Sequence, residues 1–157
     1  MKLKDFVCFD AVVAELKSTD RDEVIAELIQ SLDKAGKLGK AEPDKIIRAV
    51  IKRENEASTG MGKGVAVPHV KYSDFNEVVA AVGRSAKGIE FDSLDKKPVY
   101  SVILLISPAD ESEQHLQAME NVFKHLQQEK FRKFLRQSQS VEEIVDLLKE
   151  ADENPSL

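Results

Sequence analysis

The chain has 157 residues, of which 42% are hydrophobic and 32% are charged, and its 28 acidic and 23 basic side chains give a net charge of −5. This balance is typical of a globular protein and excludes an intrinsically disordered chain. The negative charge argues against nucleic acid as the main partner. The length suits one domain spanning residues 1–157, with a tail from about residue 152 that we expect to fray.

Cysteine usage and hydropathy bear on the cellular compartment. Cys8 is the only cysteine and cannot form an internal disulfide, which suits a reducing environment. The N-terminus lacks the apolar core of a signal peptide, and no apolar run approaches the ~20 residues that cross a bilayer. We therefore expect a cytoplasmic protein without membrane insertion.

The first third of the chain is predicted to begin with a strand and continue as helix. Residues 11–16 are mostly apolar and are expected to form the strand. Asp20 with Glu23 three residues later is typical of a helix N-terminus. Apolar residues then recur at helical spacing as far as Gly36, a residue type that commonly ends helices.

A second helix is predicted to begin at Pro43, because proline suits the first helical turn. Its apolar face consists of Ile46, Ile47, Val50 and Ile51. Arg53 then lies near the C-terminus of this helix. Two interpretations of Arg53 remain open: a solvated cation that favours the helix dipole, and a planar clamp for two phosphoryl oxygens.

Residues 58–69 form the most distinctive stretch, Ser-Thr-Gly-Met-Gly-Lys-Gly-Val-Ala-Val-Pro-His. Alternating glycines let backbone amides approach a ligand closely. Residues 65–67 are typical of a strand, and Pro68 fixes its own φ, so that His69 is held on a rigid segment. The order and spacing argue against a dinucleotide-binding motif, because there the glycines follow a strand and open a helix. A phosphoryl acceptor, a turn residue and a metal ligand remain as interpretations of His69.

The second half of the chain contains two predicted strands and three predicted helices. Residues 77–83 form the first strand, closed by Lys87 and Gly88, and residues 99–107 form an apolar strand that is buried on both faces and ended by Pro108. The helices are expected over 112–127, 129–137 and 141–151, the last with a capping box of Ser140 and Glu143. Strands flanked by helices predict an α/β domain.

Two histidines lie on the first of these helices. Its apolar stripe is taken as Leu116, Met119, Phe123 and Leu126. At ~100° per residue, His115 lies about 60° from the centre of that stripe and His125 about 140° away. We therefore expect His115 at the edge of the buried face, in a structural or a functional role, and His125 in solvent.

Several segments in order resemble the enzyme IIA domains of the fructose/mannitol/nitrogen-regulatory class, from the bacterial phosphoenolpyruvate-dependent phosphotransferase system. The matching segments are Arg53-Glu54, residues 58–69, 88–95 and 98–99, and the His-Leu-x-Ala motif at 115–118. The chain departs from the family pattern at Lys96, where a glycine is usual, and at Glu120 and Asn121, which replace small residues. These departures are expected to alter a turn and a helix face near the site.

The resemblance implies a three-layer α/β/α sandwich with a mixed central sheet and a phosphorylated histidine at the edge of the sheet. It assigns His69 as the phosphohistidine, modified at Nε2, with His115 supporting transfer and Arg53 clamping the phosphoryl group. The phosphate pocket would be lined by Thr59, Gly60, Gly62 and Gly64. Lys63 and Lys71 are either solvated or steer phosphorylated partners. The resemblance implies no cofactor and no metal.

The function that follows is that of a phosphocarrier. The donor would be phosphorylated HPr or a paralogue, and the acceptor a IIB component or a regulated protein. No IIB or transport segment accompanies the domain in this sequence, which favours the nitrogen-regulatory branch. The alternatives are a sugar-specific IIA component, a regulatory module that has lost transfer, and a metal-dependent hydrolase built on His69 and His115.

Overall fold

The computed structural model of the chain describes residues 1–154 and 156–157. Position 155 belongs to the tail that we expected to fray and lies outside the described residues. The last helix continues to Glu153, and the carboxylate of Asp152 accepts hydrogen bonds from the backbone nitrogens of Leu3 at 2.6 Å and Lys4 at 2.9 Å. The start of the tail is thus tied to the N-terminus.

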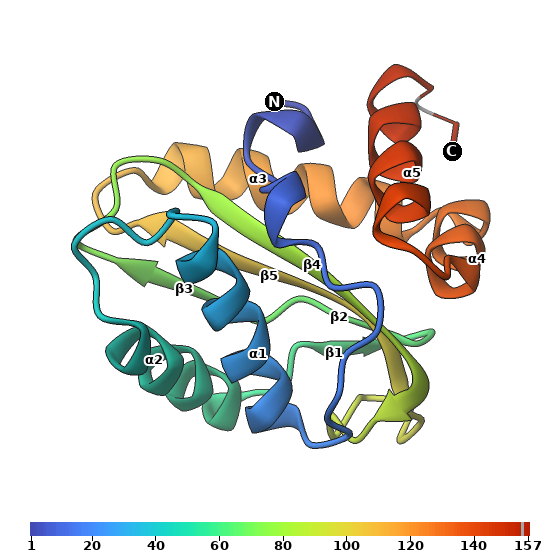
Figure 1. The fold of residues 1–157 in the computed structure, drawn as a ribbon, viewed down its shortest axis with the longest axis horizontal. Helices are drawn as coiled ribbons and strands as arrows, with labels where there is room; N and C mark the ends of the chain where they lie inside the picture. Colours follow the sequence, from blue (N-terminus) through green and yellow to red (C-terminus); the bar gives the residue numbers. More distant parts are fainter. Residues whose placement is uncertain (155) are drawn as a thin grey trace.

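The order of elements is two short 3-10 helices, two α-helices, five strands and three further α-helices among the described residues (Figure 1). The 3-10 helices are η1 (Leu3–Asp5) and η2 (Phe9–Ala11), and the α-helices are α1 (Arg21–Lys34), α2 (Pro43–Glu56), α3 (Ser112–Leu126), α4 (Glu129–Gln137) and α5 (Val141–Glu153). The strands are β1 (Gly60–Gly62), β2 (Val65–Ala66), β3 (His69–Tyr72), β4 (Val79–Ile89) and β5 (Val99–Pro108).

The sheet is mixed and is organised around β5. One edge of β5 pairs in parallel with β2 near Ser101 and with β3 near Leu105, while the other edge pairs antiparallel with β4. β1 forms an antiparallel hairpin with β2. Among the described strands, β3 pairs only with β5, which places it at an edge of the sheet.

Helices cover both faces of this sheet, which confirms the predicted three-layer α/β/α sandwich. One face carries Leu104 and Ile106 of β5 and packs against α1 and α2. The opposite face carries Ile103 and Leu105 and packs against α3, α4, α5 and η1. Figure 1 shows α1 and α2 together at the lower left and α3 to α5 along the upper and right sides. Because the side chains of β5 alternate between two buried faces, residues 102–106 of this strand are all apolar.

The prediction of a first strand over residues 11–16 was wrong. Residues 9–11 form η2, and instead of a continuous ladder the segment makes isolated bridges with β4, of Val7 with Ala80 and of Val13 with Gly83. The apolar side chains of this segment are buried because it lies along the outer edge of β4, where a 3-10 turn interrupts regular pairing.

The end of the next strand was also placed wrongly. β4 does not close at Lys87 and Gly88 but continues to Ile89 through an irregular register after Arg84. The helix signals, by contrast, are confirmed. Asp20 accepts a hydrogen bond from the backbone nitrogen of Glu23 at the start of α1, and Ser140 does the same for Glu143 at the start of α5.

The buried face of α3 differs from the predicted stripe, and His125 is not in solvent. Leu116 is 59% exposed, whereas His125 is only 2% exposed and its ring lies 5.5 Å from that of Phe131 in α4. The face that meets the sheet is made by smaller residues, Ala118 and Val122, which allow a close approach. α4 packs against the C-terminal end of α3 and covers the His125 side chain there.

No helix in the part of the chain that the structure describes combines the length and the low polarity required to cross a membrane.

Candidate functional site

The pairing of β3 with β5 directs the candidate histidine toward α3. His69 pairs with Leu105 and Lys71 pairs with Ser107. Paired residues point to the same face of a sheet, and Leu105 belongs to the face that packs against α3. His69, Lys71 and Ser107 therefore share the face on which α3 presents His115.

The ring of His69 is held in one orientation by its own chain. Nδ1 of His69 lies 2.8 Å from the carbonyl oxygen of Val67, two residues earlier. A carbonyl oxygen only accepts, so Nδ1 carries the proton and donates. In the neutral ring, Nε2 then has a free lone pair. Pro68 stiffens the short connection that makes this contact.

His115 lies next to His69 and has its own orienting partner. The two ring centroids are 5.5 Å apart, with the planes tilted by 45°. Nδ1 of His115 lies 2.7 Å from the hydroxyl oxygen of Ser107, a side chain that is fully buried. If the hydroxyl donates in this pair, Nε2 of His115 carries the proton and offers an N–H group to a ligand beside His69.

Both rings are held in their neutral form. Burial lowers the pKa of His69, and the positive charges of Arg53 and Lys71 lower it further, while the Val67 carbonyl and the Glu54 carboxylate act in the opposite direction. Burial also lowers the pKa of His115; repulsion between the two rings if both were protonated, and the positive charge of Lys71, lower it further. At neutral pH the pair therefore keeps an unprotonated nitrogen available for attack.

Arg53 lies in the last turn of α2, as predicted. One of its terminal nitrogens donates to the carbonyl oxygen of Ala57 at 3.0 Å, just beyond the helix. Its charge is close enough to lower the pKa of His69. The remaining donors of its planar guanidinium are suited to bind phosphoryl oxygens at this edge.

Glu54, the neighbour of Arg53, organises the loop that leads to the hairpin. It is 2% exposed, and its two carboxylate oxygens accept from the backbone nitrogen of Thr59 at 2.5 Å and from the Thr59 hydroxyl at 2.8 Å. The carbonyl oxygen of Thr59 in turn accepts from the backbone nitrogen of Val67. Glu54 and Thr59 thus support the segment that orients the His69 ring.

The three glycines of the 58–69 stretch lie in two different parts of the β1–β2 hairpin. Gly60 packs so closely against Ser93 that a Cβ atom there would collide with it. Gly62 and Gly64 lie toward the tip of the β1–β2 hairpin, and Gly64 accepts hydrogen bonds from the backbone nitrogens of residues 100 and 101. Val65 of the hairpin pairs with Ser101, whereas His69 pairs with Leu105. These two positions on β5 are four residues apart, which corresponds to about 13 Å along the strand. The structure therefore brings Thr59 toward His69 but not the hairpin tip.

Two of the three departures from the family pattern have local explanations, and nothing in the structure explains Glu120, which is exposed on α3. Lys96 adopts the left-handed conformation, with φ of 61°, so the turn keeps the backbone that a glycine would adopt. This conformation costs a side-chain-bearing residue roughly 1–2 kcal/mol. The side-chain nitrogen of Asn121 donates to the carbonyl oxygen of Met1 at 2.9 Å, so this residue packs against the N-terminus.

Two residues that build the site, Glu54 and Ser107, were not assigned a role from the sequence. Glu54 carried a signal, since it accompanies Arg53 in the family motif. Ser107 carried none, because its role depends on where α3 crosses β5. As for the metal interpretation of His69, the described residues contain no group of three or more His, Cys, Asp or Glu side chains positioned to hold a metal ion.

The fold and site define a class: an α/β domain with a neutral histidine pair beside an arginine at a sheet edge, an arrangement suited to accepting a phosphoryl group. The family model described as "Phosphoenolpyruvate-dependent sugar phosphotransferase system, EIIA 2" matches residues 7–151. The chain belongs to this family, and the resemblance seen in its motifs is confirmed.

Relatives of two kinds are similar to the chain. The PTS system fructose-specific EIIABC component of Bacillus subtilis is 32% identical over 152 residues, which are 97% of this chain but only 24% of that protein. The nitrogen regulatory protein of Escherichia coli is 32% identical over 136 residues, covering 85% of this chain and 78% of that protein. The crystal structure of the nitrogen regulatory protein IIA-Ntr from Neisseria meningitidis has the same fold, with a TM-score of 0.84 at 23% identity, covering 93% of this chain and 98% of that one.

Proposed function

We propose that the protein is a phosphocarrier that accepts a phosphoryl group on Nε2 of His69. The observation that carries the proposal is the 2.8 Å contact between His69 Nδ1 and the Val67 carbonyl oxygen. Because Nδ1 is occupied as a donor, Nε2 is the nitrogen left to attack phosphorus.

The remaining residues are assigned by what they can offer the transferred group. Phosphoryl transfer depends mainly on positioning and on stabilisation of charge. Arg53 supplies a charged planar donor, and His115 supplies an N–H group when Ser107 donates to its Nδ1. As Nε2 of His69 forms a bond to phosphorus, the bond between phosphorus and a ring nitrogen of the phosphorylated donor protein breaks. The electron pair of that bond returns to the ring of the donor protein. Thr59 is kept as a lining residue; Gly60, Gly62 and Gly64 serve the hairpin.

We propose phosphorylated HPr or a paralogue as the donor, in the cytoplasm. Of the possible roles of the phosphorylated protein, we favour regulation of protein partners. This role is in line with the E. coli nitrogen regulatory protein, which the chain matches over most of both lengths. Transfer to a sugar-specific IIB component is the second candidate, and the fructose-specific relative favours it.

A transfer assay tests this function. The protein is incubated with labelled phosphoenolpyruvate, enzyme I and HPr, and acid-labile label is followed with HPr present or omitted. We expect labelling that depends on HPr. Absence of label in a folded protein would instead indicate a binding module without transfer. Addition of a fructose-type IIB domain then distinguishes the regulatory role from sugar-specific transfer, because only a sugar-specific component should lose its label to that domain rapidly.

A further inference from the structure

We propose that a basic hollow beside α4 binds a small metabolite that carries a phosphate group, at a site separate from His69. The hollow has a volume of about 490 Å³ and lies between the tip of the β1–β2 hairpin, the bulged part of β4, the start of β5 and one face of α4. This volume is within the range of about 300–1,000 Å³ that small-molecule sites occupy.

The charge of the hollow is opposite to that of the whole chain. Basic side chains from three elements line it, against one acidic side chain, Glu129; the basic residues are Lys63, Arg84, Arg132, Lys133 and Arg136. The chain as a whole has five more acidic than basic residues. A concave surface lined by one sign of charge concentrates ions of the opposite sign, so the hollow favours anions.

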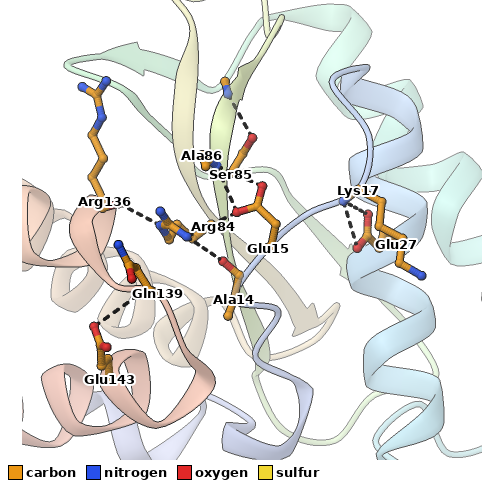
Figure 2. Close-up of polar contacts among 11 residues, drawn as sticks. Ala14, Glu15, Lys17, Glu27, Arg84, Ser85, Ala86, Arg136, Gln139 and Glu143 are labelled. Carbon is orange, nitrogen blue, oxygen red and sulfur yellow. Dashed lines mark hydrogen bonds and ion pairs between the residues drawn. The ribbon is translucent and has the colours of Figure 1, made fainter.

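One of these cations is structural and holds the others in place. The Arg84 side chain donates to the carbonyl oxygen of Arg136 at 2.7 Å and to that of Ala14 at 3.2 Å, and it pairs with the Glu15 carboxylate at 3.3 Å (Figure 2). These contacts tie the C-terminal part of α4 to the N-terminal segment and to β4. Arg84 is thus neutralised by Glu15 and fixes the wall of the hollow.

The other cations keep donors for a ligand. Figure 2 shows the Arg136 side chain extending away from the Arg84 contacts, and its guanidinium lies 3.6 Å above the centre of the Tyr100 ring. Stacking on an aromatic ring orients a guanidinium while leaving its edge donors available. Arg132 uses one terminal nitrogen on the carbonyl oxygen of Leu126. Within the described part of the chain, neither arginine has a carboxylate partner.

The chemistry of these donors indicates phosphate. Arg132 and Arg136 are one helical turn apart on α4 and face the same hollow, and paired guanidinium groups match the oxygens of a phosphate better than single amines do. The hollow is separate from the His69 site. It is lined by Tyr100 and Ser101 of β5, whereas His69 pairs with Leu105.

The test is a titration of the whole protein with pyrophosphate at constant ionic strength, followed by amide NMR shifts, with potassium chloride as the salt control. We expect saturable shifts around residues 63–65, 84–86 and 129–137. Arg136→Gln and Arg132→Gln should each weaken binding by about tenfold or more. Arg48→Gln, which removes an exposed arginine from α2, should leave binding unchanged.

Three results of the titration itself would overturn the proposal: shifts that grow without saturation as in chloride, shifts confined to the surroundings of His69 and His115, or equal weakening by Arg48→Gln. Binding of a poly-glutamate peptide without any response to pyrophosphate would also overturn it, in favour of an acidic protein partner. Neither arginine is assigned a part in phosphoryl transfer, so this test can fail while the transfer assay succeeds.

Discussion

The carbonyl oxygen of Val67 lies 2.8 Å from Nδ1 of His69, across a connection of one proline. This contact sets both the orientation and the tautomer of the ring with a backbone atom, which a side-chain substitution cannot easily remove. It explains why the Val-Pro-His sequence at the end of the glycine stretch is more informative than a histidine alone. The chemistry proposed for His69 depends on it.

Loss of the second histidine should slow transfer without abolishing it. His115→Ala removes an N–H group beside His69, and loss of one such donor typically costs on the order of 10²–10³ in rate. Single-turnover transfer from phosphorylated HPr measures this effect. Ser107→Ala should give a smaller decrease, because Ser107 acts only by orienting His115. His115→Gln, which keeps a donor, should recover part of the rate; phosphate found on His115 would contradict the supporting role.

Arg53 should be sensitive to geometry as well as charge. Arg53→Lys keeps the charge and loses the two-pronged donor, so we expect transfer roughly 10- to 100-fold slower, and a larger loss for Arg53→Ala. The free energy of unfolding should change by no more than about 0.5 kcal/mol. Transfer kinetics and a melting curve are measured for each variant, with Arg48→Lys as the matched control. Wild-type transfer rates in both Arg53 variants would show that Arg53 does not bind the phosphoryl group and is a solvated cation at the end of its helix.

Glu54 should matter for the stability of the fold. It is buried, and its carboxylate accepts two hydrogen bonds from Thr59. Each hydrogen bond to a charged group contributes about 1.5–3 kcal/mol, so loss of the two bonds in Glu54→Ala should lower the free energy of unfolding by about 3 kcal/mol or more. Urea denaturation measures this, and Glu56→Ala, an exposed neighbour on the same helix, should change it by no more than about 0.5 kcal/mol. Equal effects of the two variants would show that the Glu54 contacts are unimportant.

The buried histidines predict that stability falls as the pH is lowered. Burial lowers the pKa of His69, His115 and His125 in the folded protein, whereas in the unfolded chain they titrate near pH 6.5. Between these values the unfolded chain binds more protons, so the free energy of unfolding decreases as the pH falls through and below about 6.5. Urea midpoints at pH 7.5, 6.5 and 5.5 measure this. His125→Gln should flatten the dependence, and an unchanged slope would exclude His125 as a contributor.

Features set by neighbouring residues were predicted well from the sequence. The caps at Asp20 and Ser140 depend on contacts three residues away, and the buried strand after residue 99 is marked by its continuous apolar run. Helices near the predicted ranges followed from such signals, whereas the layer order was implied only by the family resemblance. Arg53 was likewise placed correctly at the end of its helix.

Features set by distant parts of the chain were not predictable in the same way. The face of α3 was misplaced because large apolar residues were taken to mark it, while the sheet requires the small Ala118 and Val122 for a close approach. His125 is buried by α4, which follows it in the chain. The pair of Ser107 and His115 arises only where a helix crosses a strand, and no local pattern encodes that crossing.

The most direct test of the central claim determines which histidine ring nitrogen carries the phosphoryl group. Protein labelled with ¹⁵N at histidine is incubated with phosphoenolpyruvate, enzyme I and HPr, and the ring nitrogens are followed by NMR before and after phosphorylation. We predict that the phosphoryl group appears on Nε2 of His69, that Nδ1 of the same ring stays protonated against Val67, and that His69→Ala takes up no phosphate. Phosphate on Nδ1 of His69, on His115, or on the His69→Ala variant would contradict this assignment.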